Sequence, residues 1–284
     1  MKLGALELVF VPDGHFRLDG GMLFGVVPRV LWQKRASPDT ENRVALEMNC
    51  LLIKGPDGHN IIVDTGLGTH LSEKERGQVW GLEEGPRLLD GLRALGLAPE
   101  DIDLVVNSHL HLDHSGGNTT IRDGRIVPTF PRARYLVQRR EWEDACHVNE
   151  RTRASYFPQY LAPLAEAGVL ELLDGETQLT PYLRVMPSPG HTAGHQSVLI
   201  GEGDDKALYL GDVAPFTVHF ERLAWIPAID VFPLTTLETK RSLVTEALHN
   251  DHRLIFYHDP QTTAGRLSHV EDGKYRVSPL SSPS

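Results

Sequence analysis

Histidine is concentrated in a few short segments of this 284-residue sequence. Three of the 14 histidines fall in the run His109-Leu110-His111-Leu112-Asp113-His114, and His191 and His195 flank one short turn. Imidazole titrates near neutral pH and is the commonest metal ligand in proteins. Four metal-binding side chains within six residues are hard to explain by packing, because each costs desolvation free energy unless it is paired. The run therefore predicts a metal site.

Other potential ligands follow other predicted strands. Asp64 comes directly after an apolar run, and Asp212 and His258 each follow a later one. Ligand sites collect at strand ends in open α/β sheets. His109 and His111 can point the same way while the chain is still extended. Asp113 and His114 would then lie on the next turn and address a neighbouring point in space.

The elements that position these residues are expected from periodicity and turn signals. Predicted strands cover residues 6–11, 45–53, 61–63, 103–107, 134–138, 169–173, 183–186, 196–200, 207–210 and 254–257. A helix is predicted over 86–95, and broken helices over 139–168 with interruptions at Pro158 and Pro163. A late helix over 236–249 is announced by the capping-box spacing of Thr235 and Glu238. Strands interleaved with helices in both halves predict an α/β fold with two sheet layers covered by helices.

Composition excludes several classes of function. The formal charge is −10, from 28 basic and 38 acidic residues, which argues against a protein that tracks nucleic-acid phosphates. No stretch approaches about 18 uncharged apolar residues, so no membrane span is expected. The first residues lack the apolar core of a secretion signal. With only Cys50 and Cys146, we expect a cytoplasmic protein with reduced thiols.

The ordered set of donors resembles the metallo-β-lactamase superfamily. The run 109–114 matches its HxHxDH signature, and the order and approximate spacing of the remaining donors hold over residues 44–258. The resemblance implies an αββα four-layer sandwich that forms a single domain over residues 1–284, with a binuclear metal site at one edge of its two sheets. An N-terminal extension, about residues 1–43, would contribute to the active-site rim or to a dimer contact.

The family pattern also implies a role for each donor. It gives two ligand sets and one bridging residue: His109, His111 and His191; Asp113, His114 and His258; and Asp212 between them. Asp64 would orient ligands from behind. The implied cofactor is two divalent ions, zinc in the first place, although manganese, iron or nickel also accept nitrogen and oxygen ligands. A metal-bridging hydroxide would attack the substrate, with Asp113 as the catalytic proton carrier.

Departures from subfamily patterns favour a lactonase-like branch. The second ligand set has His114 and no cysteine, unlike the β-lactamases. Residues 21–28 and the Pro-Gly-His-Thr-x-Gly-His turn at 189–195 resemble N-acyl-homoserine lactonases, pyridoxolactonase and related organophosphate hydrolases. This resemblance implies hydrolysis of a small-molecule lactone or related ester, with a homodimer as the candidate assembly. Acyl-homoserine lactonases often carry a tyrosine shortly after the bridging aspartate, whereas residues 213–216 read Val-Ala-Pro-Phe, which favours an apolar pocket wall.

Several residues are candidates for the substrate pocket, and three other functions remain open. The pocket candidates are Met22, Phe24, Phe216, His219 and Trp225, with Trp32 and Phe220 as further apolar candidates. His195 is expected to form a hydrogen bond within its own turn. The alternatives are a thioesterase of the glyoxalase II type, a persulfide dioxygenase with a single iron, and a metal-bound sensor without catalysis.

Overall fold

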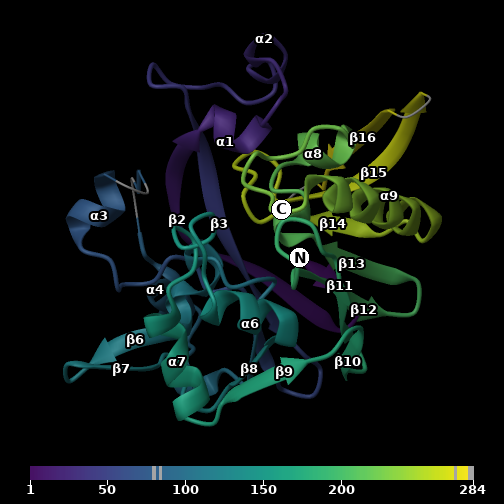
Figure 1. The fold of residues 1–284 in the computed structure, drawn as a ribbon. Helices are drawn as coiled ribbons and strands as arrows, with labels where there is room; N and C mark the ends of the chain where they lie inside the picture. Colours follow the sequence, from purple (N-terminus) through teal and green to yellow (C-terminus); the bar gives the residue numbers. More distant parts are fainter. Residues whose placement is uncertain (79–80, 83–84, 272–273, 281–284) are drawn as a thin grey trace. The chain divides into compact units, whose positions relative to one another are not determined.

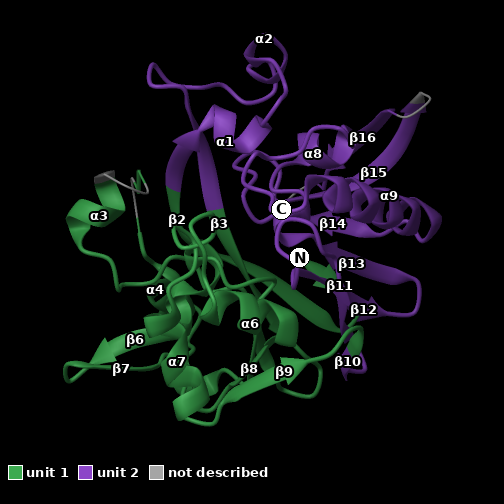
Figure 2. Ribbon diagram, viewed as in Figure 1, with its two compact units in different colours: residues 1–15, 48–177 green, residues 16–47, 178–284 purple. Residues whose placement is uncertain are grey.

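The structure of this protein is a computed structural model, which describes residues 1–78, 81–82, 85–271 and 274–280. The chain divides into two compact units, which Figure 2 draws in different colours. Unit 1 comprises Met1–His15 and Met48–Thr177, and unit 2 comprises Phe16–Glu47 and Gln178–Ser284. The N-terminal residues therefore contribute to both units.

The first sheet has seven strands among the described residues. Their spatial order is β1 (Lys2–Leu3), β2 (Leu6–Asp19), β3 (Arg43–Lys54), β4 (Asn60–Val63), β5 (Leu104–Val106), β8 (Arg134–Gln138) and β9 (Leu170–Leu173). The last four are parallel to one another. Residues 61–63 and 104–106 are buried throughout, which explains their continuous apolar runs, because parallel strands are covered on both faces. Figure 1 labels β2, β3, β8 and β9 among these strands.

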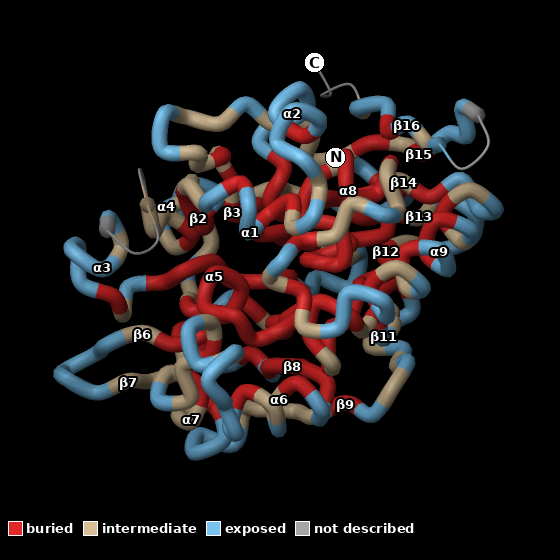
Figure 3. The backbone as a smooth tube through the Cα atoms, turned by 45° about the horizontal axis from the view of Figure 1, so that its top comes forward, coloured by how far each residue is buried: buried red, intermediate tan, exposed pale blue. Residues whose placement is uncertain are grey.

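Short helices connect the parallel strands of unit 1. They are α3 (Glu73–Gln78), α4 (Leu88–Ala94), η1 (Pro99–Asp101), α5 (Leu112–Ser115), η2 (Gly116–Asn118), α6 (Arg139–Cys146) and α7 (Pro158–Glu166). A separate hairpin joins β6 (Thr119–Arg122) and β7 (Arg125–Pro128). Helix α6 contacts β8 and β9, and Figure 3 draws β8 in the red of buried residues. Buried apolar side chains of this region, among them Val137, Ala145 and Leu161, form one core cluster.

One predicted break in these helices is wrong. Pro158 does begin α7, at its first turn, but Pro163 lies inside the same helix. A proline in a helix removes one backbone hydrogen bond and crowds the preceding turn. Leu161 and Leu164 flank Pro163 and are both buried, so their packing stabilises the helix on either side of it.

The second sheet also has seven strands among the described residues. Their order is β10 (Thr177–Thr180), β11 (Leu183–Pro187), β12 (Gln196–Glu202), β13 (Asp205–Tyr209), β14 (Arg253–Ile255), β15 (Ala264–Glu271) and β16 (Lys274–Pro279). Strands β13 and β14 pair in parallel, and the chain between them forms η3 (Gly211–Val213), α8 (Thr217–Glu221) and α9 (Pro233–His249). A buried cluster joins Leu243 and Val244 of α9 to Leu208 and Leu254 of the sheet. Unit 2 also contains α1 (Gly20–Phe24) and α2 (Arg29–Trp32).

The predicted start of the late helix is also wrong. Helix α9 begins at Pro233, so Thr235 and Glu238 lie within it and form no capping box. Proline suits the first helical position because its missing N–H has no partner there in any case. The adjacent Thr236 turns its hydroxyl towards Asp230, outside the helix. In the part of the chain that the structure describes, none of the helices has the length and apolar character needed to cross a membrane.

Candidate metal centre

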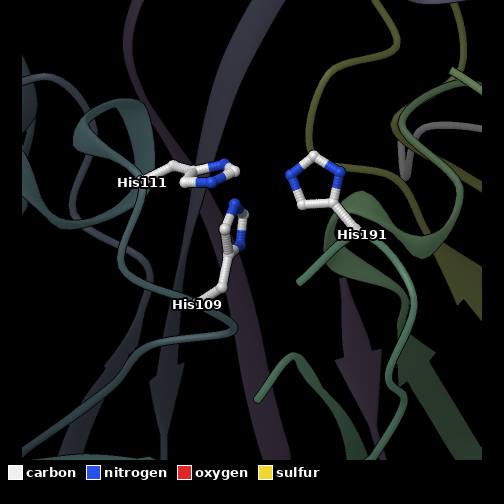
Figure 4. Close-up of side chains that lie close together, drawn as sticks. All are labelled: His109, His111 and His191. Atoms are coloured by element: carbon white, nitrogen blue, oxygen red, sulfur yellow. The ribbon is translucent and has the colours of Figure 1, made fainter. Parts of the chain in front are cut away.

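The HxHxDH run forms a compact group of donors in unit 1. Strand β5 ends at Val106, and the chain stays extended at His111 before α5 begins at Leu112. The rings of His109 and His111 have centroids 4.5 Å apart (Figure 4). Asp113 and His114 lie on the single turn of α5, with Asp113 Oδ2 3.9 Å from His114 Nε2. The rings of His109 and His114 have centroids 4.1 Å apart, so the four donors of the run lie together as one group.

Asp64 holds the same group from the end of the adjacent strand β4. Its Oδ1 accepts a hydrogen bond from the backbone N–H of Ser108 at 2.7 Å, and its Oδ2 accepts one from Ser108 Oγ at 2.6 Å. The Nδ1 atom of His114 lies 2.8 Å from the same Oδ2. A histidine that donates from Nδ1 keeps its lone pair on Nε2 for a metal. Asp64 therefore lies where it can orient a ligand.

Close backbone packing fixes the loops on either side of this group. Gly116 follows α5, and a Cβ added there would lie 2.0 Å from the carbonyl oxygen of Leu67. Only glycine allows such an approach. The loop after β4 and the end of α5 are thereby held against each other within unit 1.

Glu141 supports the donor group of unit 1 and was not predicted from the sequence. Its side chain is fully buried, and its Oε1 accepts hydrogen bonds from the backbone N–H of Leu110 at 2.9 Å and from the hydroxyl of Tyr156 at 2.7 Å. The ring of Tyr156 lies 4.8 Å from that of His111. The available signal was an acidic residue four positions before Ala145, on the buried face of α6.

The second group of donors lies in unit 2 and is drawn from three strand ends. His191, also drawn in Figure 4, follows β11, Asp212 lies in η3 after β13, and His258 follows β14. Asp212 Oδ2 lies 3.5 Å from His191 Nε2, and Asp212 Oδ1 lies 3.3 Å from His258 Nε2. One carboxylate thus presents a different oxygen to each of two imidazoles.

The imidazole orientations in unit 2 are fixed by partners on the opposite side of each ring. His258 Nδ1 donates to the carbonyl oxygen of Glu47 at 2.7 Å, and His191 Nδ1 donates to Asp230 Oδ1 at 2.9 Å. Both rings therefore turn Nε2 towards Asp212. His195 forms the predicted hydrogen bond in its own turn, with Ser188 Oγ at 2.8 Å, and its Nε2 accepts from the backbone N–H of Asp212 at 3.0 Å.

Asp230, Thr236 and Lys240 are further residues that the sequence analysis missed. Asp230 is 4% exposed, and its Oδ2 accepts a hydrogen bond from Thr236 Oγ1 at 2.7 Å. Lys240 is fully buried and donates from Nζ to the carbonyl oxygen of Trp225 at 2.7 Å. Burial lowers the pKa of Lys240 to about 7, although the charge of Asp230 acts in the opposite direction. The signal was two polar residues, four apart, on the buried face of α9.

The predicted pocket residues mostly form a packed aromatic cluster in unit 2. Phe24 is fully buried, and its ring stacks on Trp32 at 4.8 Å and on His219 at 5.2 Å. His219 donates from Nε2 to the carbonyl oxygen of Leu23 and accepts at Nδ1 from the backbone N–H of Phe216. Burial lowers the pKa of His219 to about 3, with the charge of Lys240 contributing, so His219 is neutral at physiological pH.

The remaining pocket candidates differ in exposure. Met22 is 41% exposed and Trp225 is partly buried, whereas Phe216 is 4% exposed. Phe220 belongs to the main core cluster of unit 2. The contacts of Phe24 and His219 therefore hold α1 against α8, and Met22 has the most accessible side chain of the set.

The donor set fits borderline divalent cations. The two groups offer five imidazoles and the carboxylates of Asp113 and Asp212, and none of these donors is a thiolate. Zinc, manganese, iron and nickel all accept such nitrogen and oxygen ligands. Desolvation of the carboxylates would be offset by bound cations, because buried charges are paired or coordinate metals in folded proteins.

Histidine and aspartate donors at the strand ends of an α/β fold are typical of metal-binding proteins. A comparison with family models identifies the group. The model described as the metallo-beta-lactamase superfamily matches residues 45–258. The chain belongs to the metallo-beta-lactamase superfamily, and its fold is the metallo-β-lactamase fold, which confirms the predicted fold class.

Similar proteins of known name include several lactonases. The N-acyl homoserine lactonase AttM of Rhizobium radiobacter is 31% identical over 231 residues, covering 75% of this chain and 82% of the relative. An N-acyl homoserine lactonase of a Bacillus species is 32% identical over 203 residues, covering 68% and 70%. A probable metal-dependent hydrolase from Staphylococcus aureus has a TM-score of 0.86 and 29% identity, covering 99% of this chain and all of that one.

Proposed function

We propose that this protein is a metal-dependent hydrolase that opens the ester bond of a small lactone. The proposal is supported by membership of the superfamily and by lactonase relatives that are 31% and 32% identical to the chain. The observation that carries it is the carboxylate of Asp212, whose two oxygens face His191 and His258 separately. A carboxylate in this position can bridge two cations.

Under this proposal, the donors of the two units bind two divalent ions. We assign the ligands as the family pattern implies: His109, His111 and His191 for the first ion, Asp113, His114 and His258 for the second, and Asp212 for both. When bound, such ions lower the pKa of water to about 7 and polarise the carbonyl oxygen of an ester. We propose zinc as the first metal to test.

Asp113 is the proposed proton carrier. It and His111 are the most exposed of the proposed ligands, at 8% each, so the carboxylate of Asp113 can be reached by a substrate. The attacking water would lose a proton to Asp113 as its oxygen bonds to the carbonyl carbon. The ring C–O bond then breaks, and the same proton passes to the leaving alkoxide. The products are a carboxylic acid and an alcohol within one molecule.

The apolar residues after Asp212 bear on the substrate. Residues 213–216 are buried, and Phe216 packs beside His219 and Phe24. These residues offer no phenolic hydroxyl to the substrate carbonyl. We therefore propose that the substrate carbonyl depends on the bound ions for polarisation, and that lactones with and without an acylamino group are both substrates.

The direct test measures hydrolysis of a panel of lactones by the zinc-loaded chain, with S-lactoylglutathione and phosphotriesters as comparison substrates. We expect ring opening of N-acyl homoserine lactones or simpler lactones, and its loss in Asp212→Ala. Turnover of S-lactoylglutathione alone would indicate the thioesterase function. Two bound ions without turnover of any member of the panel would contradict catalysis and favour a sensor.

A further inference from the structure

Both units contain a histidine whose Nδ1 atom faces a buried carboxylate. In unit 1 this pair is His114 and Asp64, with 2.8 Å between Nδ1 and Oδ2. In unit 2 it is His191 and Asp230, with 2.9 Å between Nδ1 and Oδ1. The family pattern accounts for Asp64 but assigns nothing to Asp230, which lies 39 residues beyond His191 in the sequence.

The environment of Asp230 holds its carboxylate in one orientation. The residue is 4% exposed, and its second oxygen accepts a hydrogen bond from Thr236 Oγ1 on α9. The backbone adds to this arrangement, because the N–H of Val231 donates to the carbonyl oxygen of His191 at 3.0 Å. The N–H of Phe232 donates to the carbonyl oxygen of Gly190 at 2.9 Å. The segment carrying Asp230 is therefore bonded to the segment carrying His191 through both side chains and main chain.

We propose that Asp230 is the positioning residue for His191, and that it controls how firmly the ion at His191 is held without affecting the ion at His114. The inference rests on the metal sites of the proposed function. A carboxylate that accepts from Nδ1 fixes the tautomer with a lone pair on Nε2 and makes that nitrogen a stronger ligand. Asp230 thus supports His191 in unit 2 as Asp64 supports His114 in unit 1.

The experiment follows release of zinc from the purified full chain to a chromogenic chelator, together with zinc content per chain. Asp230→Asn keeps the size of the side chain and removes its charge. We expect the release of one of the two ions to become about 10- to 100-fold faster, the usual loss for such partners, while the other ion leaves at the wild-type rate. Thr236→Val removes the hydrogen bond to one oxygen of Asp230 and should increase the release rate of the same ion by a smaller factor.

Glu221→Gln is the matched control. Glu221 is also a buried carboxylate of unit 2, but its partners are Arg35 and the backbone N–H of Val277, neither of which is a proposed ligand. The change removes the same charge and should leave both release rates unchanged. Circular dichroism and the melting temperature of each variant establish that the fold is intact.

A double-mutant cycle distinguishes positioning from general loosening of the structure. In a His191→Ala background, Asp230→Asn should not change the release of the remaining ion, whereas in a His258→Ala background its full effect should persist. Wild-type release in Asp230→Asn, an equal effect in both backgrounds, or a wild-type chain that retains no zinc would overturn the proposal. A chain that passes these tests yet opens no lactone would contradict only the proposed function.

Discussion

The two groups of donors are built in different ways. Unit 1 takes its four donors from one continuous run. Asp64, the carboxylate that supports His114, lies just after the neighbouring parallel strand β4. Unit 2 takes its three donors from three separate strand ends between residues 191 and 258, with a partner for each ring from another segment. Local spacing therefore determines the first group, whereas the second depends on the tertiary structure of the whole unit.

The largest expected effect concerns the residue that links ligands within unit 2. Asp212→Ala removes the oxygens that face His191 and His258. We expect lactone turnover to fall by at least about 10⁴-fold, which corresponds to about 5.5 kcal/mol in activation free energy. Steady-state kinetics together with zinc content would test this. A variant that keeps both ions and full turnover would exclude Asp212 as the bridging residue.

Asp113→Asn is the corresponding test in unit 1. An amide oxygen can still approach a cation, but it cannot take a proton from water. Proton transfer by a positioned side chain contributes about 10²- to 10⁴-fold, so we expect a loss of about 10³-fold in kcat with zinc content retained. Equal losses of zinc and turnover would show instead that Asp113 acts only as a ligand.

The third prediction concerns Glu141, the buried carboxylate that accepts hydrogen bonds next to the donors of unit 1. Glu141→Ala leaves the N–H of Leu110 and the hydroxyl of Tyr156 without their buried acceptor. Unsatisfied buried donors each cost about 1–3 kcal/mol, so with two of them we expect the free energy of unfolding to fall by about 2–6 kcal/mol. Urea denaturation measures this fall, with Glu143→Ala on the exposed side of the same helix as the control. A change below about 0.5 kcal/mol, the usual size at neutral surface sites, would contradict the role.

The contrast between the units also explains what the sequence could predict. The strands ending at Val63 and Val106 and the geometry of residues 109–114 follow from local apolar runs and from the alternation of an extended chain. Asp212 and His258 were recognised as donors because each follows a predicted strand, and the family resemblance implied their roles. Asp230 and Glu141 were missed because their functions come from partners 39 and 31 residues away, and a sequence contains no local signal of such distances.

The errors in helix boundaries have the same origin. The spacing of Thr235 and Glu238 satisfies a local rule, yet Pro233 and the hydrogen bond from Thr236 to Asp230 place the helix start earlier. The hairpin of β15 and β16 was also missed, although polar and apolar residues alternate from Lys274 to Ser278. Strand β15 pairs with β16 and also with β14, which comes earlier in the chain.

The last prediction is a pH dependence of stability that unit 2 carries through Lys240. Its pKa is lowered by burial from 10.5 to about 7 in the folded chain, so the unfolded state binds more protons between these values. The free energy of unfolding should therefore rise with pH from about 7 towards about 10.5, by at most about 1.4 kcal/mol per pH unit from this residue. Below about pH 7 both states are protonated, and the cost of burying the charge is fully present.

Lys240→Met removes the titrating group and keeps an apolar chain of similar length, so the rise with pH should be shallower than in the wild type. The exposed Lys74→Met serves as the control and should leave the slope unchanged. Urea denaturation across this pH range measures the slope. If Lys240→Met shows the wild-type slope, the ammonium group of Lys240 does not cause the rise of stability with pH.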